Sequence, residues 1–236
     1  MITGINVIFS ILAVILSFVP FLLVVRKNLS QDKPCLTVAL FWLMNGLSII
    51  PMFFHWAWYA GSRNQIIFSL NLLDAPFMFL IFYFSYRKKL FAFGLAASIA
   101  FEIFILYLKS LGYDSNLIIT NTSGTIALLL NFWGLYRYFR LKTYTDQDNV
   151  LVYVHTGFVF YYSLFFEVTY TYKMLSNRSS KTPFALFSPY GMFICYLAIF
   201  LSTLLISFGF WKYARPGRRK TYLDALAKLF IIRETD

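Results

Sequence analysis

Seven long apolar runs follow one another along the chain, and no other feature restricts its possible folds as strongly. Each run is roughly 20 residues or longer, the length that an α-helix needs to cross a hydrocarbon core about 30 Å thick. Because backbone polar groups cannot stay unpaired in lipid, runs of this length must be helices. We therefore predict an all-α polytopic membrane protein with transmembrane helices at about 4–26, 35–59, 65–86, 90–108, 116–136, 150–172 and 184–211.

The composition agrees with lipid as the surrounding medium. Apolar residues make up 59% of the 236-residue chain and aromatic residues 21%, whereas only 13% are charged. A soluble protein of this size has too little interior to hide so much apolar surface. The loops between the runs are short, so we expect one seven-helix bundle over residues 1–211 and a basic segment over 212–236.

The net charge of +11 is distributed unevenly between the two sides of the predicted bundle. Sixteen basic residues fall on the side of the C-terminus and five on the other. By the positive-inside rule the sixteen mark the cytoplasm, which places the N-terminus outside and the C-terminus inside. Topology thus accounts for the charge, and we expect the lipid bilayer rather than nucleic acid as a partner. The predicted location is the inner (plasma) membrane of the cell.

The segment 221–233 has the spacing of an amphipathic helix, with apolar residues at 222, 223, 226, 229 and 230. The basic residues around it suit a helix that lies along the inner leaflet. The same apolar face would also suit docking to a cytoplasmic signalling partner. Both interpretations stay open.

Three acidic residues interrupt the apolar runs, namely Asp74, Glu102 and Glu167. In the predicted orientation all three lie in the outer half of the membrane. A charged carboxylate in lipid is costly unless it is protonated, paired or hydrated, so intramembrane acids usually mark functional sites. Asn71 precedes Asp74 by one helical turn and shares its face of the helix.

We hypothesise that polar groups from all runs except 4–26 and 90–108 form a cavity open to the outside. Asp74 and Glu167 would be its acidic floor and wall, and aromatic rings would stack on a ligand. The candidate ligand-binding or proton-handling residues are Asp74, Asn71, Glu167, His55, Trp58, Tyr170, Asn121 and Glu102. The alternative is structural: such groups also hydrogen-bond helices together, and His55 with its tryptophans also fits an interfacial aromatic belt.

The inner half is more sparsely polar, with Asn45, Asn131 and His155 as the main exceptions. We expect the two asparagines to hydrogen-bond between helices and His155 to be satisfied in place rather than to bind a ligand. His55 and His155 are the only histidines and lie at opposite depths, so no metal site is predicted. The chain has no Gly-x-Ser-x-Gly motif and no phosphate-binding glycine loop, which favours a protein that is not an enzyme.

Seven helices, an outside N-terminus and a carboxylate in the third helix resemble the layout of microbial rhodopsins. That family attaches retinal to a lysine midway along the seventh helix, whereas residues 184–211 contain no lysine and Lys212 lies past the inner end. Covalent retinal is therefore excluded and no other cofactor is indicated, while noncovalent binding of a lipid or chromophore stays open.

Three stretches carry a broader resemblance, namely NLLDAPFMFLIFYF, NTSGTIALLLNFWGLYRYF and VLVYVHTGFVFYYSLFF. They look like a family of uncharacterised bacterial seven-helix integral membrane proteins, in which polar positions punctuate the third and fifth helices. The resemblance implies a bacterial membrane protein with a sensory role, and it brings no functional residues to carry over.

We therefore expect a membrane receptor or sensor that binds a small amphipathic or cationic ligand in the outer cavity. It would signal to a cytoplasmic or membrane partner through the basic loops and the 221–233 helix. A proton-coupled transporter or channel, with Asp74 and Glu167 titrating, is the alternative. A structural subunit of a membrane complex and a lipid-modifying enzyme are further alternatives.

Overall fold

The computed structural model describes the backbone of residues 2–53, 57–112, 116–141, 145–176 and 189–213. It describes their side chains except at 2–5, 49, 51–53, 57–70, 116–117, 120, 169–176, 189–190 and 192. This part of the chain folds entirely as helices, so the predicted all-α class is confirmed. The helices are α1 (Ile2–Arg26), α2 (Lys33–Phe53), α3 (Ala57–Tyr86), α4 (Lys89–Ser110), α5 (Asn116–Arg140), α6 (Asp146–Ser176) and α7 (Pro189–Lys212). The predicted helix at 221–233 lies outside the described residues.

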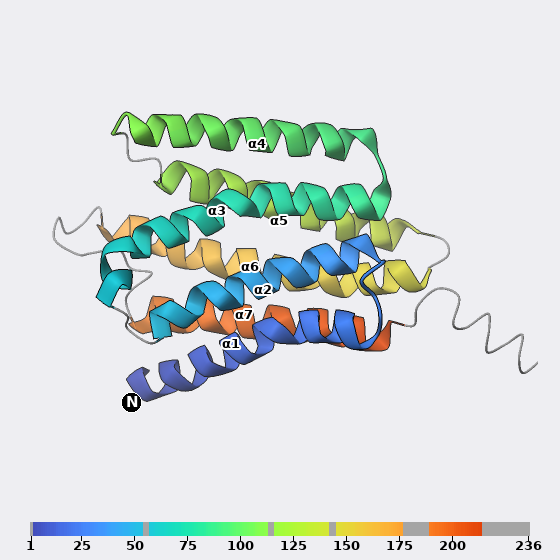
Figure 1. Ribbon diagram of the computed structural model, residues 1–236, viewed down its shortest axis with the longest axis horizontal. Helices are drawn as coiled ribbons and strands as arrows, with labels where there is room; N and C mark the ends of the chain where they lie inside the picture. The colour runs from blue at the N-terminus through green and yellow to red at the C-terminus, as the bar shows by residue number, and fades with distance from the viewer. Residues whose placement is uncertain (1, 54–56, 113–115, 142–144, 177–188, 214–236) are drawn as a thin grey trace, which may run out of the picture.

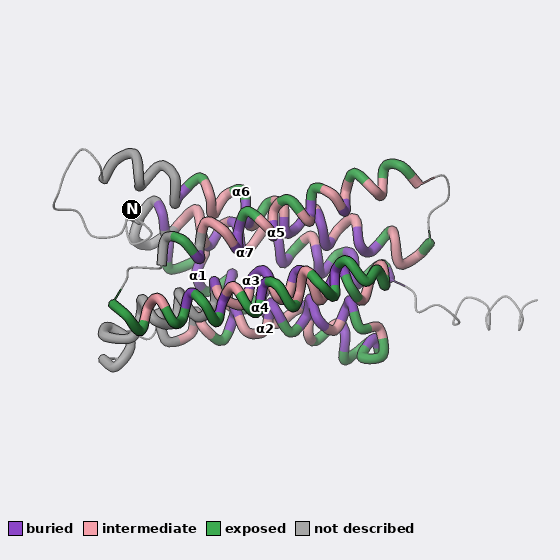
Figure 2. The backbone as a smooth tube through the Cα atoms, turned by 90° about the horizontal axis from the view of Figure 1, so that it is seen from above, coloured by how far each residue is buried: buried purple, intermediate pink, exposed green. Residues whose placement is uncertain are grey.

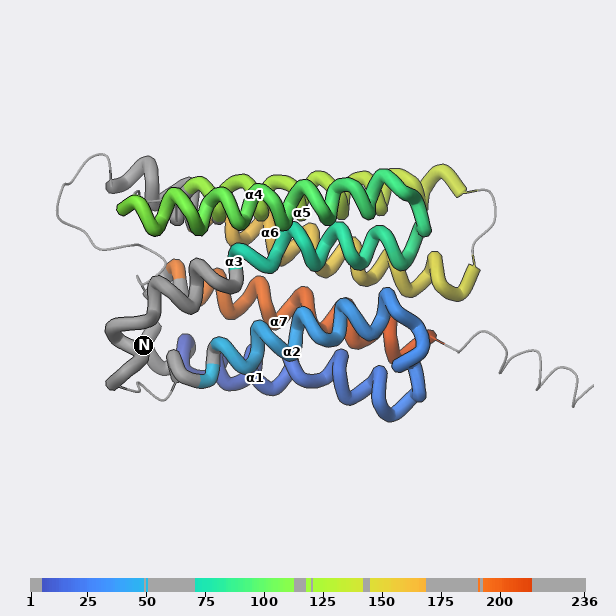
Figure 3. The backbone as a smooth tube through the Cα atoms, turned by 45° about the horizontal axis from the view of Figure 1, so that its top comes forward, coloured from blue at the N-terminus to red at the C-terminus, as the bar shows by residue number. Residues whose placement is uncertain are grey.

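Helices that follow one another in sequence run antiparallel (Figure 1). Six of them close a ring in the order α1, α2, α3, α5, α6 and α7, because each packs against the next and α7 packs against α1. α4 packs against α3 on the outside of this ring (Figure 3). The main hydrophobic core fills the ring and takes residues from all six of its helices.

Basic residues gather at one end of the bundle. The links from α1 to α2 and from α3 to α4 lie at this end, together with the end of α5, the start of α6 and Tyr213 (Figure 1). We call it the basic end; its described basic residues are Arg26, Lys27, Lys33, Arg87, Lys88, Lys89, Arg137, Arg140 and Lys212. The fold thus collects at one end the charges that sequence alone assigned to one side.

Four described helical segments are long and apolar enough to cross a membrane: Asn6–Arg26, Lys89–Ser110, Asp146–Val168 and Phe193–Lys212. Large apolar side chains also face outward, and on α4 Leu90 is 70% exposed and Phe93 is 74% exposed. Figure 2 shows that buried positions follow the sides on which helices face one another. Exposed apolar surface of this extent indicates a surface that contacts lipid or another protein, so the membrane-protein class has support from both helix length and surface.

α6 begins four residues before the predicted run, because a side-chain cap extends it. Asp148 Oδ2 accepts a hydrogen bond from the Thr145 N–H at 3.0 Å, and Thr145 Oγ1 accepts one from the Asp148 N–H at 3.1 Å. This reciprocal pair is a capping box. Asp146 and Asp148 in the first turn also favour the positive end of the helix dipole.

Other helix boundaries differ from the prediction as well. α2 is described as far as Phe53, and α3 already includes residues 57–64, so the predicted boundaries near 59 and 65 were wrong. The hydropathy of a run marks its most apolar part, whereas the helix continues as long as its backbone hydrogen bonds do. α7 is described from Pro189, a residue that suits the first position of a helix because that position needs no N–H donor, and residues 184–188 of the predicted run lie outside the described residues.

Glycine allows α6 and α7 to approach closely. A Cβ atom added at Gly157 would lie 2.9 Å from Ile206 Cγ1, and one added at Gly209 would lie 2.8 Å from Tyr153 Cβ. Both contacts are tighter than ordinary packing permits. Small residues at such crossings are typical of helices that associate within membranes, where close backbone packing replaces the hydrophobic effect.

Hydrogen bonds fasten the α1–α2 link to the end of α7 at the basic end. The Lys27 ammonium donates to the Trp211 carbonyl and, at 3.2 Å, to the Tyr213 carbonyl, which satisfies acceptors at the helix end. The Tyr213 hydroxyl donates to Asp32 Oδ2 at 2.7 Å, while Asp32 Oδ1 accepts from the Cys35 N–H at 3.4 Å. Burial, followed by the hydrogen bond to Asp32, raises the pKa of Tyr213 above its ordinary value.

We expect Tyr213→Phe to lower the free energy of unfolding by about 0.5–1.5 kcal/mol near neutral pH, because it removes one hydrogen bond. The raised pKa keeps Tyr213 neutral in the folded state above its unfolded value of 10.0. The wild type therefore loses the stability contributed by Tyr213 as the pH rises through that value, whereas the phenylalanine variant lacks this contribution at every pH. Equilibrium unfolding in detergent micelles should show the difference shrinking above about pH 10; a constant difference would contradict the assignment.

Candidate ligand-binding site

Asp74 lies inside the bundle on α3, next to two tyrosines of α6. Its side chain is only 8% exposed, and its carboxylate interacts with Tyr161 and Tyr162. The Tyr162 hydroxyl is buried beside this carboxylate, yet it makes no hydrogen bond of standard length and angle within the described residues. The Asp74 carboxylate and the Tyr162 hydroxyl can therefore form further hydrogen bonds with a ligand.

A second buried carboxylate, on α4, interacts with Asp74. Glu102 of α4 is 9% exposed, its Oε1 atom has no partner among the described residues, and it interacts electrostatically with Asp74. Two buried carboxylates near each other are unfavourable when both are charged, because each is desolvated and each repels the other. A proton or a bound cation between them would relieve both penalties.

Aromatic rings from α2 and α6 pack beside these carboxylates. Trp42 of α2 stacks on Phe158 with ring centroids 5.8 Å apart and meets Tyr161 edge to face at 5.2 Å. Tyr161 in turn contacts Tyr162 at 4.9 Å, which connects these rings to Asp74. Trp42 is fully buried, but its Nε1–H has no partner in the described part of the chain. We call Asp74, Glu102, Trp42 and Tyr162 the Asp74 layer.

The other predicted site residues occupy different positions. Asn71 is buried one turn from Asp74, and Asn121 is half-buried near the start of α5, where its carbonyl accepts from Thr125 Oγ1 at 2.6 Å. Glu167 is exposed on α6, so the prediction that it shares a buried wall with Asp74 is wrong. His55 and the side chains of Trp58 and Tyr170 lie outside the described residues.

A second buried polar cluster joins α3, α5 and α6 nearer the basic end. His155 Nε2 lies 3.0 Å from the Tyr86 hydroxyl oxygen, and His155 Nδ1 lies 2.9 Å from Asn131 Oδ1. Asn131 Nδ2 donates to the Ala127 carbonyl at 2.7 Å, which turns Oδ1 toward the imidazole. An amide oxygen only accepts, so Nδ1 carries the hydrogen and Nε2 accepts from Tyr86. The predictions that Asn131 links helices and that His155 is satisfied in place are confirmed, whereas Asn45 Nδ2 donates at 3.0 Å to a carbonyl of its own helix α2 rather than to another helix.

Arg137 covers this cluster from α5. Its guanidinium carbon lies 4.0 Å from the centroid of the Tyr86 ring, and its Nη1 atom is buried with no partner among the described residues. We call Tyr86, Asn131, Arg137 and His155 the His155 cluster. Sequence analysis missed Tyr86 and Arg137 because both stand at the ends of apolar runs, where Tyr and Arg ordinarily mark the membrane interface.

Apolar side chains separate the Asp74 layer from the His155 cluster. Tyr162 and His155 stand seven residues apart on α6, which corresponds to about 10 Å along the axis. Met78 of α3 and Phe158 of α6 lie between them, and both are fully buried. The same two helices therefore carry polar groups at two depths with an apolar plug in between.

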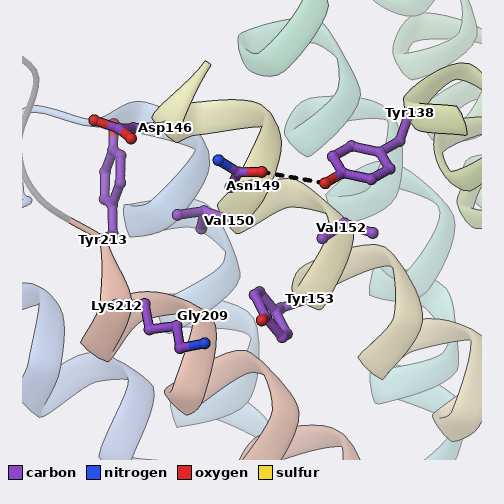
Figure 4. Close-up of a pocket in the computed structure, with 9 residues that line it drawn as sticks. All are labelled: Tyr138, Asp146, Asn149, Val150, Val152, Tyr153, Gly209, Lys212 and Tyr213. Atoms are coloured by element: carbon purple, nitrogen blue, oxygen red, sulfur yellow. Dashed lines mark hydrogen bonds between the residues drawn. The ribbon is translucent and has the colours of Figure 1, made fainter. Parts of the chain in front are cut away.

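Three cavities lined by described residues lie at the basic end, one of which, beside the His155 cluster, has a volume of only about 10 Å³. The one in Figure 4 has a volume of about 280 Å³ and lies among the ends of α5, α6 and α7. Within it the Tyr138 hydroxyl donates to Asn149 Oδ1 at 3.1 Å. Asp146 and Lys212 both line this cavity, so its formal charges balance. The remaining cavity is larger and more basic.

No protein-family model, no curated protein and no solved structure matches this chain. Its class therefore rests on its own features: an all-helical fold, helices long and apolar enough to cross a membrane, and buried polar groups at two depths of the bundle.

Proposed function

We propose that the chain is a seven-span membrane protein of the receptor or sensor type, with its N-terminus outside and its basic end in the cytoplasm. Four described helical segments, in α1, α4, α6 and α7, meet the length and hydropathy required for a span, and the remaining helices α2, α3 and α5 complete the ring with α1, α6 and α7. The concentration of basic residues at one end supports the orientation. The sequence resemblance to bacterial seven-helix proteins supports a bacterial inner membrane as the location.

The proposed ligand is a small cation with an apolar body, bound in the Asp74 layer. One observation carries this proposal: the buried carboxylates of Asp74 and Glu102 interact, while Glu102 Oε1 and the Trp42 Nε1–H have no partner in the described part of the chain. A cationic group would neutralise the carboxylates, and the ring of Trp42 would add a cation–π contact. The Trp42 N–H would donate to an acceptor atom on the ligand, and the Tyr162 hydroxyl would orient the Asp74 carboxylate.

α3 and α6 would transmit the binding event. Asp74 and Tyr162 on these helices belong to the Asp74 layer, and Tyr86 and His155 on the same helices belong to the His155 cluster. A shift of α3 relative to α6 would therefore change both. The basic loops would carry this change to a cytoplasmic or membrane partner, which makes the protein a sensor rather than a passive binder.

We expect Asp74→Asn to abolish the stabilisation of the protein by cationic ligands, because the amide removes the negative charge and keeps the shape. The experiment measures thermal unfolding of nanodisc-embedded protein against a panel of alkylammonium, choline-type and polyamine cations. For a ligand at 100 times its Kd, the wild type should gain about 2.7 kcal/mol, and the variant should gain none.

Glu167→Gln is the matched control, since it neutralises a carboxylate that is exposed on α6. This variant should keep the ligand-induced stabilisation of the wild type. Two results would argue against the cation site. In one, no cation of the panel stabilises the wild type or Glu167→Gln; in the other, a cation stabilises Asp74→Asn as strongly as the wild type.

A proton-coupled transporter is the second candidate, and the His155 cluster favours it. Two titratable side chains, Asp74 and His155, stand at different depths within the same ring of helices, as a stepwise proton path requires. Proteoliposomes with an imposed pH gradient distinguish the candidates. Proton flux in the wild type that disappears in both Asp74→Asn and His155→Phe would establish transport. Wild-type proteoliposomes that show no proton flux, together with cation binding by the wild type, would support the receptor.

A further inference from the structure

The larger cavity at the basic end has a volume of about 660 Å³ and is separate from the Asp74 layer. Arg87 on its wall stands 13 residues after Asp74, about 20 Å along the helix axis. The cavity lies between the α1–α2 link, the end of α3, the start of α6 and Tyr213. Its lining residues are Gln31, Asp32, Lys33, Pro34, Tyr83, Phe84, Ser85, Arg87, Gln147 and Tyr213.

The lining combines two cations with an acid whose oxygens are already engaged. Lys33 and Arg87 are exposed, and the Lys33 ammonium lies 5.4 Å from the centroid of the Phe84 ring. Asp32 accepts hydrogen bonds at both oxygens, from the Tyr213 hydroxyl and from the Cys35 N–H. The cavity therefore presents a net positive charge, unlike the neighbouring cavity of Figure 4, where Asp146 balances Lys212.

Arg87 occupies a backbone position that normally favours glycine. Its φ angle is +50°, and its N–H donates to the Tyr83 carbonyl at 2.7 Å to end α3. Glycine adopts this left-handed conformation without a steric penalty, whereas a residue with a Cβ atom, such as arginine, adopts it at a cost in free energy. Glycine would end the helix at this position more favourably, so the arginine indicates a role for its side chain other than helix termination.

We propose that this cavity binds a phosphate-bearing ligand through Lys33 and Arg87. A guanidinium binds phosphate oxygens in a bidentate manner, and a lysine adds a point charge. The volume falls within the range of about 300–1,000 Å³ that is typical of small-molecule sites. The phosphate would come from an anionic phospholipid headgroup or from a soluble phosphate compound. The site is independent of the cation site proposed above.

The test compares two double variants that have the same net charge. Lys33→Gln/Arg87→Gln removes both cations from the cavity, whereas Lys88→Gln/Lys89→Gln removes two exposed cations that do not line it. Detergent-solubilised protein is titrated in one arm with phosphatidylglycerol, followed by native mass spectrometry. In the other arm it is titrated with inorganic phosphate at constant ionic strength, followed by thermal unfolding.

We expect the cavity variant to bind at least about tenfold more weakly than the wild type, since a hydrogen bond to a charged group is lost. The control variant should remain within about twofold of the wild type. Binding in the lipid arm alone identifies a headgroup, and binding in both arms identifies phosphate itself. Equal weakening in both double variants, or no binding in either arm, would overturn the proposal.

Arg87→Gly separates binding from folding. Because glycine suits the positive φ of this position, the variant should unfold at a temperature equal to or above that of the wild type. It should nevertheless bind the phosphate probe several-fold more weakly. A glycine variant that keeps the wild-type affinity would show that the Arg87 side chain does not take part in binding.

Discussion

Gly134→Ala should destabilise the bundle by about 1–3 kcal/mol, although alanine is the better helix former. A Cβ atom at this position of α5 would lie 2.6 Å from both Cδ2 and Nε2 of His155. The imidazole cannot turn aside freely, because Tyr86 and Asn131 hold its two nitrogens. The free energy of unfolding in detergent micelles, measured by chemical denaturation, gives the effect.

Gly124→Ala on the same helix is the control. A Cβ atom there would lie 3.2 Å from the Phe166 ring, a much less severe contact, so this variant should have nearly wild-type stability. The destabilisation by Gly134→Ala should also disappear in a His155→Ala background, because the clashing ring is then absent. An unchanged effect in that background would place the strain elsewhere.

His155→Phe should lower the free energy of unfolding by about 1–3 kcal/mol, since interhelical hydrogen bonds in membranes contribute about 0.6–1.7 kcal/mol each. The phenyl ring keeps the aromatic contact with Phe82, whose centroid lies 4.9 Å from that of the imidazole. It removes both hydrogen bonds and leaves the Tyr86 hydroxyl and Asn131 Oδ1 without their partner inside the bundle.

Tyr86→Phe, which removes only one of these bonds, should have a smaller effect than His155→Phe. In the double variant the two effects should not add, and the coupling energy should be about 0.6–1.7 kcal/mol. Strictly additive effects would mean that the hydroxyl and the imidazole do not stabilise each other, and that the cluster is held by packing alone.

The sequence was sufficient to predict an all-helical protein with helices apolar enough to cross a membrane, and to identify the polar side chains that interrupt its apolar runs. The helical fold, the buried position of Asp74 and the fact that His155 is hydrogen-bonded in place could be anticipated, because each follows from the length of an apolar run or from the penalty for burying a polar group. The sequence was not sufficient to identify Tyr86 or Arg137. Both have residue types that are ordinary at the end of a membrane helix, and only their neighbours make them part of a cluster.

The grouping of acids in the candidate site shows the same limit. From sequence, all three acids were placed in the outer half of the membrane, and Asp74 was paired with Glu167 because their two helices were predicted to line the cavity. In the fold Glu167 is exposed, whereas Glu102 is buried and interacts with Asp74. Depth follows from position along a helix, but direction around the bundle depends on which helices are neighbours, and α4 packs outside the ring against α3.

By itself, the sequence determined that this chain forms apolar helices with its basic residues on one side, because helix length and charge are properties of single segments. The tertiary structure decided which side chains meet: Asp74 with Tyr162 and Glu102, His155 with Tyr86 and Asn131, and Lys33 with Arg87 around one cavity. Each of these groups joins residues from different helices. Their contacts depend on the order and rotation of helices in the ring, which ridge-and-groove packing and close approach at glycine determine.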